Sequence, residues 1–98
     1  MKVHWTNTAI RHLDGIYDYI AQDSPVYAKQ QVDRLTRRSE QIAAFPQSGR
    51  MVPEFKREDI REVIEGPYRL IYVIKTEQID ILSVFHGAQK LPDTLSSG

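Results

Sequence analysis

The sequence of 98 residues contains no cysteine, no long apolar run and no surplus of charge of either sign. Without cysteine there is no disulfide and no thiolate chemistry, so packing alone must hold the fold, and a cytoplasmic location is expected. No run approaches the roughly 20 apolar residues of a membrane-spanning helix, and the N-terminus lacks the apolar segment of a signal peptide. We therefore expect neither membrane insertion nor export.

The charge balance and the missing motifs exclude further classes of function. There are 13 basic and 13 acidic side chains, whereas a domain that grips nucleic acid usually carries a clear basic excess. The sequence has no GxGxxG, P-loop or GxSxG motif, and its histidines do not follow a metal-binding spacing. We therefore predict no cofactor and no metal.

The length suits one domain covering residues 1–98, and the content of 41% hydrophobic and 27% charged residues is typical of a folded chain. Residues 2–6 alternate polar and apolar side chains and predict a short strand. From Ala9 the apolar residues repeat with helical spacing as far as Ile20. Gly15 lies inside this helix, and we expect the next helix to cross close to it.

The second helix has clear start and stop signals. Ser24 can cap the free amides of its first turn, and Pro25 suits the first helical position. An apolar seam from Ala28 to Phe45 predicts a long helix that ends at Pro46. The short connection predicts an antiparallel helical hairpin.

A loop is expected over residues 46–59. Three runs rich in β-branched and aromatic residues follow it and predict strands: IREVIE, YRLIYVIK and QIDILSVFH. The turns at Gly66-Pro67 and Thr76-Glu77 make these runs a meander. The predicted order is β-α-α-β-β-β, an α+β fold whose antiparallel sheet includes the N-terminal strand and carries the helical hairpin on one face.

The strand register decides which polar side chains meet. If Thr76 and Glu77 form a two-residue turn, Arg69 lies opposite Val84, and His86 shares the face of Arg69. Arg61 or Glu62 and the loop residue Glu54 would lie nearby. Such a group is typical of an acid–base and phosphate site, but a histidine at a strand end is more often structural, and an arginine is more often an ion-pair partner.

Three segments stand in order along the chain: AFPQSGRMVPEF, DIREVIEGPYRLIYVI and ILSVFHGAQKLP. Together they resemble the RelE/ParE superfamily of toxins from type II toxin–antitoxin modules, and most of all its ParE branch. The resemblance implies a cytoplasmic bacterial toxin with a cognate antitoxin as its partner. The free toxin is expected to self-associate through the surface that the antitoxin covers.

The branches of this superfamily differ in target, so the fold alone does not choose between them. ParE-like members inhibit DNA gyrase, whereas RelE-like members cut messenger RNA on the ribosome. The resemblance implies that Glu54 and Arg69 match positions used by some of the nucleases, with His86 as the third candidate. However, His86 is displaced by one position, no terminal aromatic follows it, and Gln89 stands where many ParE-like chains have arginine.

These departures and the neutral charge favour gyrase as the target and a binding role in place of catalysis. Messenger RNA cleavage on the ribosome, with Glu54, Arg69 and His86 as the catalytic set, is the alternative, and an inactive antitoxin-binding member is a third. We expect the residues that bind the target or the antitoxin to be Arg50, Glu54, Arg61, Arg69, His86, Gln89 and Lys90.

Overall fold

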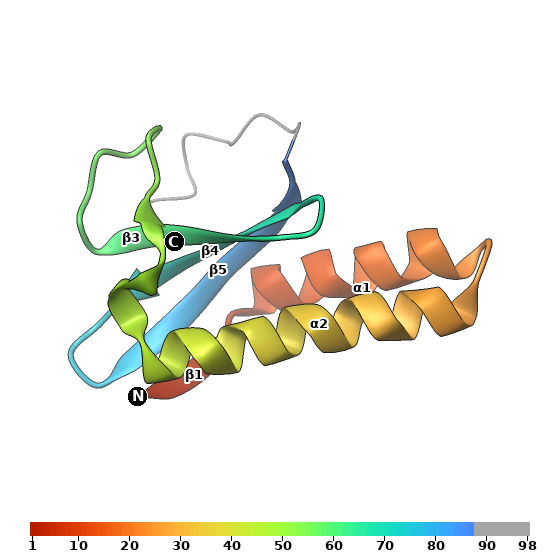
Figure 1. Ribbon diagram of the computed structural model, residues 1–98, viewed down its shortest axis with the longest axis horizontal. Helices are drawn as coiled ribbons and strands as arrows, with labels where there is room; N and C mark the ends of the chain where they lie inside the picture. The colour runs from red at the N-terminus through yellow and green to blue at the C-terminus, as the bar shows by residue number, and fades with distance from the viewer. Residues whose placement is uncertain (88–98) are drawn as a thin grey trace.

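A computed structural model of the chain describes residues 1–87. Two helices lie on one side of a five-stranded sheet with strand order β1-β5-β4-β3-β2 (Figure 1). The elements are β1 (Lys2–Trp5), α1 (Asn7–Ala21), α2 (Pro25–Ala44), the short 3-10 helix η1 (Pro46–Ser48), β2 (Arg50–Met51), β3 (Ile60–Glu65), β4 (Tyr68–Ile74) and β5 (Gln78–His86). The predicted α+β class and element order are confirmed. Within this sheet, β1 runs parallel to β5, and β2 is an additional strand inside the expected loop.

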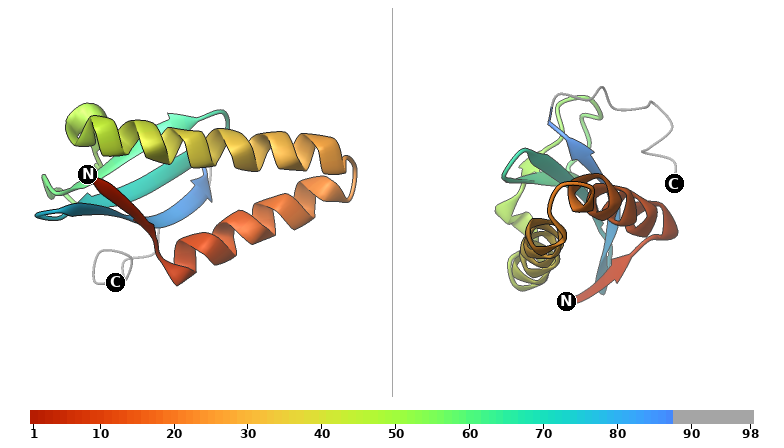
Figure 2. Two further views of the ribbon diagram at one scale, coloured as in Figure 1. Left: turned by 90° about the horizontal axis from the view of Figure 1, so that it is seen from below. Right: turned by 90° about the vertical axis from the view of Figure 1, so that its right-hand side faces the viewer.

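Side-chain caps explain where both helices begin. The Thr6 hydroxyl accepts a hydrogen bond from the Ala9 amide at 3.1 Å, so α1 begins slightly before the predicted Ala9. The Ser24 hydroxyl accepts one from the Tyr27 amide, also at 3.1 Å, which confirms the predicted cap. Figure 2 shows both helices on the same side of the sheet, with their connecting loop beyond its edge.

The main core lies between the helices and the sheet. Its buried residues are Ala9, Leu35, Ile42, Val63, Leu70, Tyr72, Ile79, Ile81 and Val84. Two expectations about the helices are wrong. Phe45 is 70% exposed, because it lies at the C-cap with non-helical dihedral angles and leaves the apolar seam. Gly15 has no atom within 4 Å of where a β-carbon would be, so α2 does not cross closely there.

A smaller apolar cluster lies on the opposite face of the sheet, which we call the second face. Its buried members are Val52, Ile60, Ile71, Leu82 and Phe85, with Phe55 packed against them. Val52 and Phe55 come from the loop between β2 and β3. This loop therefore packs on the second face, while α1 and α2 pack on the first.

A β-bulge changes the predicted register of β4 and β5. The two-residue turn is confirmed, since the Lys75 amide donates to the Gln78 carbonyl at 2.9 Å. The register then shifts between Ile71 and Tyr72, and Arg69 pairs with Phe85 and not with Val84. Because one residue of shift reverses the face of every later side chain, the expectation that His86 shares the face of Arg69 is wrong.

The segment between α2 and β3 is fixed by polar contacts to the sheet. The Tyr72 hydroxyl donates to the Pro46 carbonyl at 2.6 Å and accepts from the Gly49 amide at 3.0 Å. A β-carbon at position 49 would lie 2.5 Å from the Tyr72 hydroxyl oxygen, so glycine is needed for this close approach. Within residues 1–87, no helix combines the length and the apolarity needed to cross a bilayer.

Candidate functional site

Four charged side chains on the second face form one connected group, which we call the Arg69 network. Arg69 donates through Nε to Glu62 Oε2 at 2.8 Å, and through Nη1 and Nη2 to the two carboxylate oxygens of Glu54 at 3.0 and 3.1 Å. The other oxygen of Glu62 accepts from Arg50 Nε at 2.6 Å. The network therefore contains two arginines and two glutamates and is neutral as a whole.

The two halves of the network differ in burial. The side chain of Glu62 is fully buried and that of Arg69 is 10% exposed. The side chains of Glu54 and Arg50 are 42% and 66% exposed. The buried ion pair between Glu62 and Arg69 therefore has two more exposed partners: Arg50 binds Glu62, and Glu54 binds Arg69.

The local chain explains these positions. Glu62 lies between Ile60 and Ile64 on the second face of β3, and its backbone pairs with Ile71 on one side and Arg50 on the other. Arg69 lies on β4 beside Ile64, two residues further along β3. Residues two apart on a strand share a face, which brings Glu62 within reach of Arg69.

The hydrogen bonds from Arg69 hold the pKa of Glu54 below its ordinary value, in spite of the opposing effect of burial. Glu54 is therefore a stable carboxylate near neutral pH. A general base works best when its pKa lies near the operating pH, so this pairing disfavours Glu54 as a base.

A hollow of about 420 Å³ opens beside the network. It is lined by Arg50, Pro53, Glu54, Ile64, Arg69 and Gly87. Ile64 is 52% exposed although it is a large apolar residue on a strand. The hollow therefore combines charged groups with an apolar rim.

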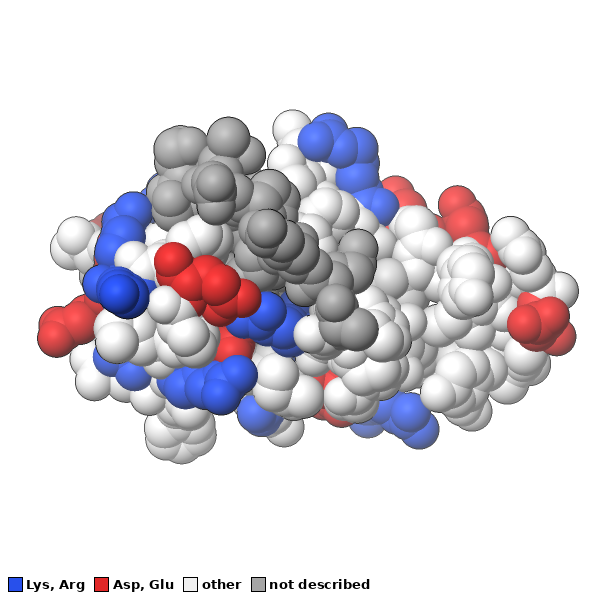
Figure 3. All heavy atoms as spheres, turned by 90° about the horizontal axis from the view of Figure 1, so that it is seen from above, with Lys and Arg blue, Asp and Glu red and all other residues white. Residues whose placement is uncertain are grey.

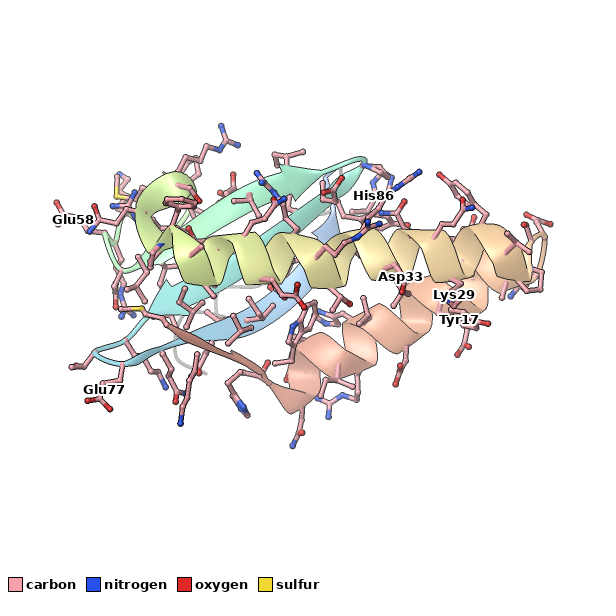
Figure 4. The ribbon with its side chains drawn as sticks, turned by 60° about the horizontal axis from the view of Figure 1, so that its bottom comes forward. Tyr17, Lys29, Asp33, Glu58, Glu77 and His86 are labelled. Atoms are coloured by element: carbon pink, nitrogen blue, oxygen red, sulfur yellow. The ribbon has the colours of Figure 1, made fainter. Side chains whose placement is uncertain are left out.

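His86 lies on the helix side of the sheet, away from the Arg69 network. Its ring packs edge-on against Tyr68 with centroids 5.9 Å apart, and it lines a separate cleft of about 640 Å³ together with α1 residues such as Arg11 and Tyr19. Figure 4 shows His86 at the opposite end of β5 from the turn that carries Glu77. Because Arg69 pairs with Phe85, the neighbouring His86 points to the other face of the sheet from Arg69 and Glu54. The three residues of the nuclease hypothesis therefore do not converge.

His12 is a residue of this cleft that the sequence did not reveal. Its Nδ1 accepts a hydrogen bond from the Val84 amide at 3.2 Å, and its ring lies 5.0 Å from that of Phe85. Burial, followed by the nearby charge of Arg11, lowers the pKa of His12 below the ordinary 6.5. The pairing of β1 with β5 ends at Ile81. His12 therefore provides the acceptor for the Val84 amide, which lies beyond that pairing.

The remaining predicted residues have other positions. Arg61 donates to the carbonyls of Gly49 and Glu58 at 3.0 Å each, so it supports the loop backbone and is not part of the Arg69 network. Gln89 and Lys90 lie outside the described residues. Among residues 1–87, no three His, Asp or Glu side chains come together to hold a metal ion.

The charges of the second face are mixed. On the side shown in Figure 3, Lys and Arg side chains are interspersed with Asp and Glu. A continuous basic patch is typical of proteins whose affinity comes from phosphate contacts. The described part of this side thus carries charges of both signs.

The profile of the ParE toxin of type II toxin–antitoxin systems, parDE, matches residues 3–91. This match covers most of the chain, and it shows that the protein is the toxin component of a type II toxin–antitoxin module. The chain belongs to the ParE toxin family.

Individual relatives agree with this assignment. The chain is 33% identical over 96 residues to the putative toxin Y4kP of Sinorhizobium fredii, with 96% of each chain covered. It is 32% identical over 88 residues to the toxin RelE2 of Caulobacter vibrioides, with 90% of this chain and 97% of the relative covered. A solved structure of the chromosomal ParDE system from P. aeruginosa is similar with a TM-score of 0.73 at 25% identity, covering 88% of this chain and 95% of that one.

Proposed function

We propose that this toxin inhibits DNA gyrase by binding to it through the second face of the sheet, and that a cognate antitoxin neutralises it in the bacterial cytoplasm. The Arg69 network and the hollow beside it form the centre of this binding surface. The toxin then acts as a binding protein and not as an enzyme.

The main support is that His86, the third candidate residue for RNA cleavage, does not join Glu54 and Arg69. His86 lies across the sheet from Arg69, because the bulge shifts the register of β5. Arg69 is engaged by two carboxylates, and Glu54 is held ionised by it. While both carboxylates are bound to it, Arg69 is poorly placed to stabilise charge on a phosphate.

The overall charge also supports a protein target. The formal net charge of the chain is zero, whereas binding to ribosomal RNA depends on many contacts from Lys and Arg to phosphates. A protein surface makes no such demand, because protein interfaces combine apolar contacts with a limited number of hydrogen bonds.

The gyrase proposal is tested by measuring supercoiling by purified gyrase with increasing toxin. We expect loss of supercoiling and accumulation of cleaved DNA complexes. Full supercoiling at excess toxin would rule out the proposal.

Messenger RNA cleavage is the second candidate, because the relative of 32% identity is called toxin RelE2. Primer extension on translated messages tests it directly. We expect intact messages with this toxin. New cuts that disappear in Arg69→Ala, with His86→Ala as a second variant, would establish the nuclease instead.

Exposed apolar residues support the proposal of a protein antitoxin. Outside the described cores, Tyr19, Val26 and Phe45 are each at least 70% exposed. An antitoxin that covers such residues gains apolar burial and also prevents the free toxin from self-associating. Size-exclusion chromatography at rising concentration, with and without antitoxin, tests this. We expect the apparent size to grow with concentration for the toxin alone and to stay constant for the toxin–antitoxin complex.

A further inference from the structure

The two carboxylates that bind Arg69 have different roles. Glu62 is fully buried in β3 and also bonds Arg50, so it is part of the sheet. Glu54 lies on the loop after β2, and its side chain is 42% exposed. Removal of Glu54 leaves Arg69 paired with Glu62, whereas removal of Glu62 breaks the buried ion pair.

The charge of the hollow depends on where Glu54 is. With Glu54 on Arg69, the network of two arginines and two glutamates is neutral. With the Glu54 side chain turned into solvent, Arg50, Arg69 and Glu62 carry one net positive charge. The N–H groups of Nη1 and Nη2 that Glu54 accepted from, at 3.0 and 3.1 Å, are then available on the wall of the hollow, while Nη2 still donates to Glu62.

The loop allows this change without unfolding. Glu54 lies between Val52 and Phe55, which pack on the second face and anchor the loop. The loop also closes on itself, because the Phe55 and Lys56 amides both donate to the Val52 carbonyl at 3.1 and 3.2 Å. A rotation of the Glu54 side chain alone therefore opens the site.

We propose that Arg69 and Arg50 form a carboxylate-binding site that Glu54 covers in the free toxin, and that an acidic side chain of a protein partner replaces Glu54 there. This inference rests on the proposed function in that it takes the second face as the binding surface. It adds that the bound group is a carboxylate, and that Glu54 occupies the site in the free toxin.

The fit favours a carboxylate over a nucleic-acid phosphate. The two oxygens of Glu54 already show that a carboxylate is bound by both Nη groups of Arg69. A nucleic-acid backbone carries many phosphates, and binding to it depends on several Lys or Arg side chains that are not already paired with carboxylates. The open hollow has only one net positive charge. Pro53 and the exposed Ile64 on its rim suit an apolar residue beside the acidic one.

The site is tested with short peptides on the purified toxin. The probes are acetyl-Leu-Glu-Leu-amide, its Gln counterpart and inorganic phosphate, and binding is followed by NMR of the Arg side-chain Nε–H groups. Glu54→Gln opens the site, and Glu58→Gln is the matched control, because Glu58 is exposed on the same loop and its side chain is outside the network.

We expect Glu54→Gln to bind the Glu peptide about two- to fivefold more tightly than the wild type, since it removes an exposed competing ion pair. Glu58→Gln should bind like the wild type. The Gln peptide and phosphate should bind more weakly than the Glu peptide. Arg69→Lys, which keeps the charge but loses the planar fork, should bind the Glu peptide more weakly than the wild type does.

Equal affinity of the wild type and Glu54→Gln would overturn the covering role. Phosphate binding as strong as that of the Glu peptide would overturn the carboxylate preference. These results are separable from the gyrase assay, since normal supercoiling beside tight peptide binding would reject gyrase as the target and leave the carboxylate site in place.

Discussion

The two faces of the sheet come from the same strands but are stabilised in different ways. On the helix side, Leu70 and Tyr72 of β4 pack against Leu35 and other apolar residues of the main core. On the second face, Arg69 of the same strand binds two glutamates. Neighbouring residues of a strand point to opposite faces, so one strand supports both a packed core and a charged surface. Apolar packing thus stabilises the first face, and a buried ion pair stabilises the second. We propose that target binding depends on the second face.

The largest effect on stability is expected from Glu62→Ala. This variant removes the buried carboxylate that joins Arg69 to Arg50, and breaking a buried ion pair costs about 3–5 kcal/mol of unfolding free energy. Urea denaturation measures the change. Glu65→Ala on the same strand is the control and should change the free energy of unfolding by less than about 0.5 kcal/mol. Similar values for both variants would show that the Arg69 network is dispensable for folding.

Truncation of a leucine on each face should show which core matters more. Leu35 is fully buried in the main core, whereas Leu82 is 7% exposed in the smaller cluster. We expect Leu35→Ala to destabilise by about 3–4 kcal/mol and Leu82→Ala by about 2 kcal/mol. Denaturant midpoints measured side by side test the order, and a larger loss from Leu82→Ala would reverse the comparison.

A smaller effect should follow from the pH dependence of His12. Its folded-state pKa is below 6.5, so the unfolded chain binds a proton more readily. Stability from His12 is therefore complete above about pH 6.5 and is lost as the pH falls toward its folded-state pKa. Thermal unfolding at pH 7.5 and 5.5 should show a larger decrease for the wild type than for His12→Asn, whose side-chain oxygen can still accept from Val84. An equal decrease would mean that His12 does not contribute.

The smallest effect on stability is expected from Glu54→Gln. The Glu54 side chain is 42% exposed, and ion pairs with an exposed partner contribute at most about 1 kcal/mol. Urea denaturation should place this variant close to the wild type, in contrast to Glu62→Ala. A loss as large as that of Glu62→Ala would make Glu54 a structural residue and not a removable cover.

Local signals in the sequence predicted most of the fold. Ser24 and Pro25 mark the start of α2, Pro46 follows its end, and Gly66 adopts the positive φ of 59° that its turn needs. Each of these signals depends on a residue and its near neighbours. Such local signals can be recognised in the sequence without knowledge of the tertiary structure.

The site was predicted only in part. Glu54 and Arg69 do meet, and both Glu62 and Arg50 were among the candidates. What the sequence did not predict is that the pairing of β2 with β3 joins Arg50 to Glu62, because a two-residue strand leaves no periodic pattern. The bulge that moves His86 to the other face depends on packing along the whole of β5. His12 bonds Val84, 72 residues away, and no local pattern marks such a contact.

The central proposal is that the second face, and not the helix side, binds the target. A matched pair of variants tests it: Ile64→Ser on the second face and Ile10→Ser on α1, at residues that are 52% and 43% exposed. In a gyrase supercoiling assay, we predict that Ile64→Ser needs about tenfold more toxin for the same inhibition, while Ile10→Ser acts like the wild type. Unchanged inhibition by Ile64→Ser together with loss of inhibition by Ile10→Ser would contradict the proposal.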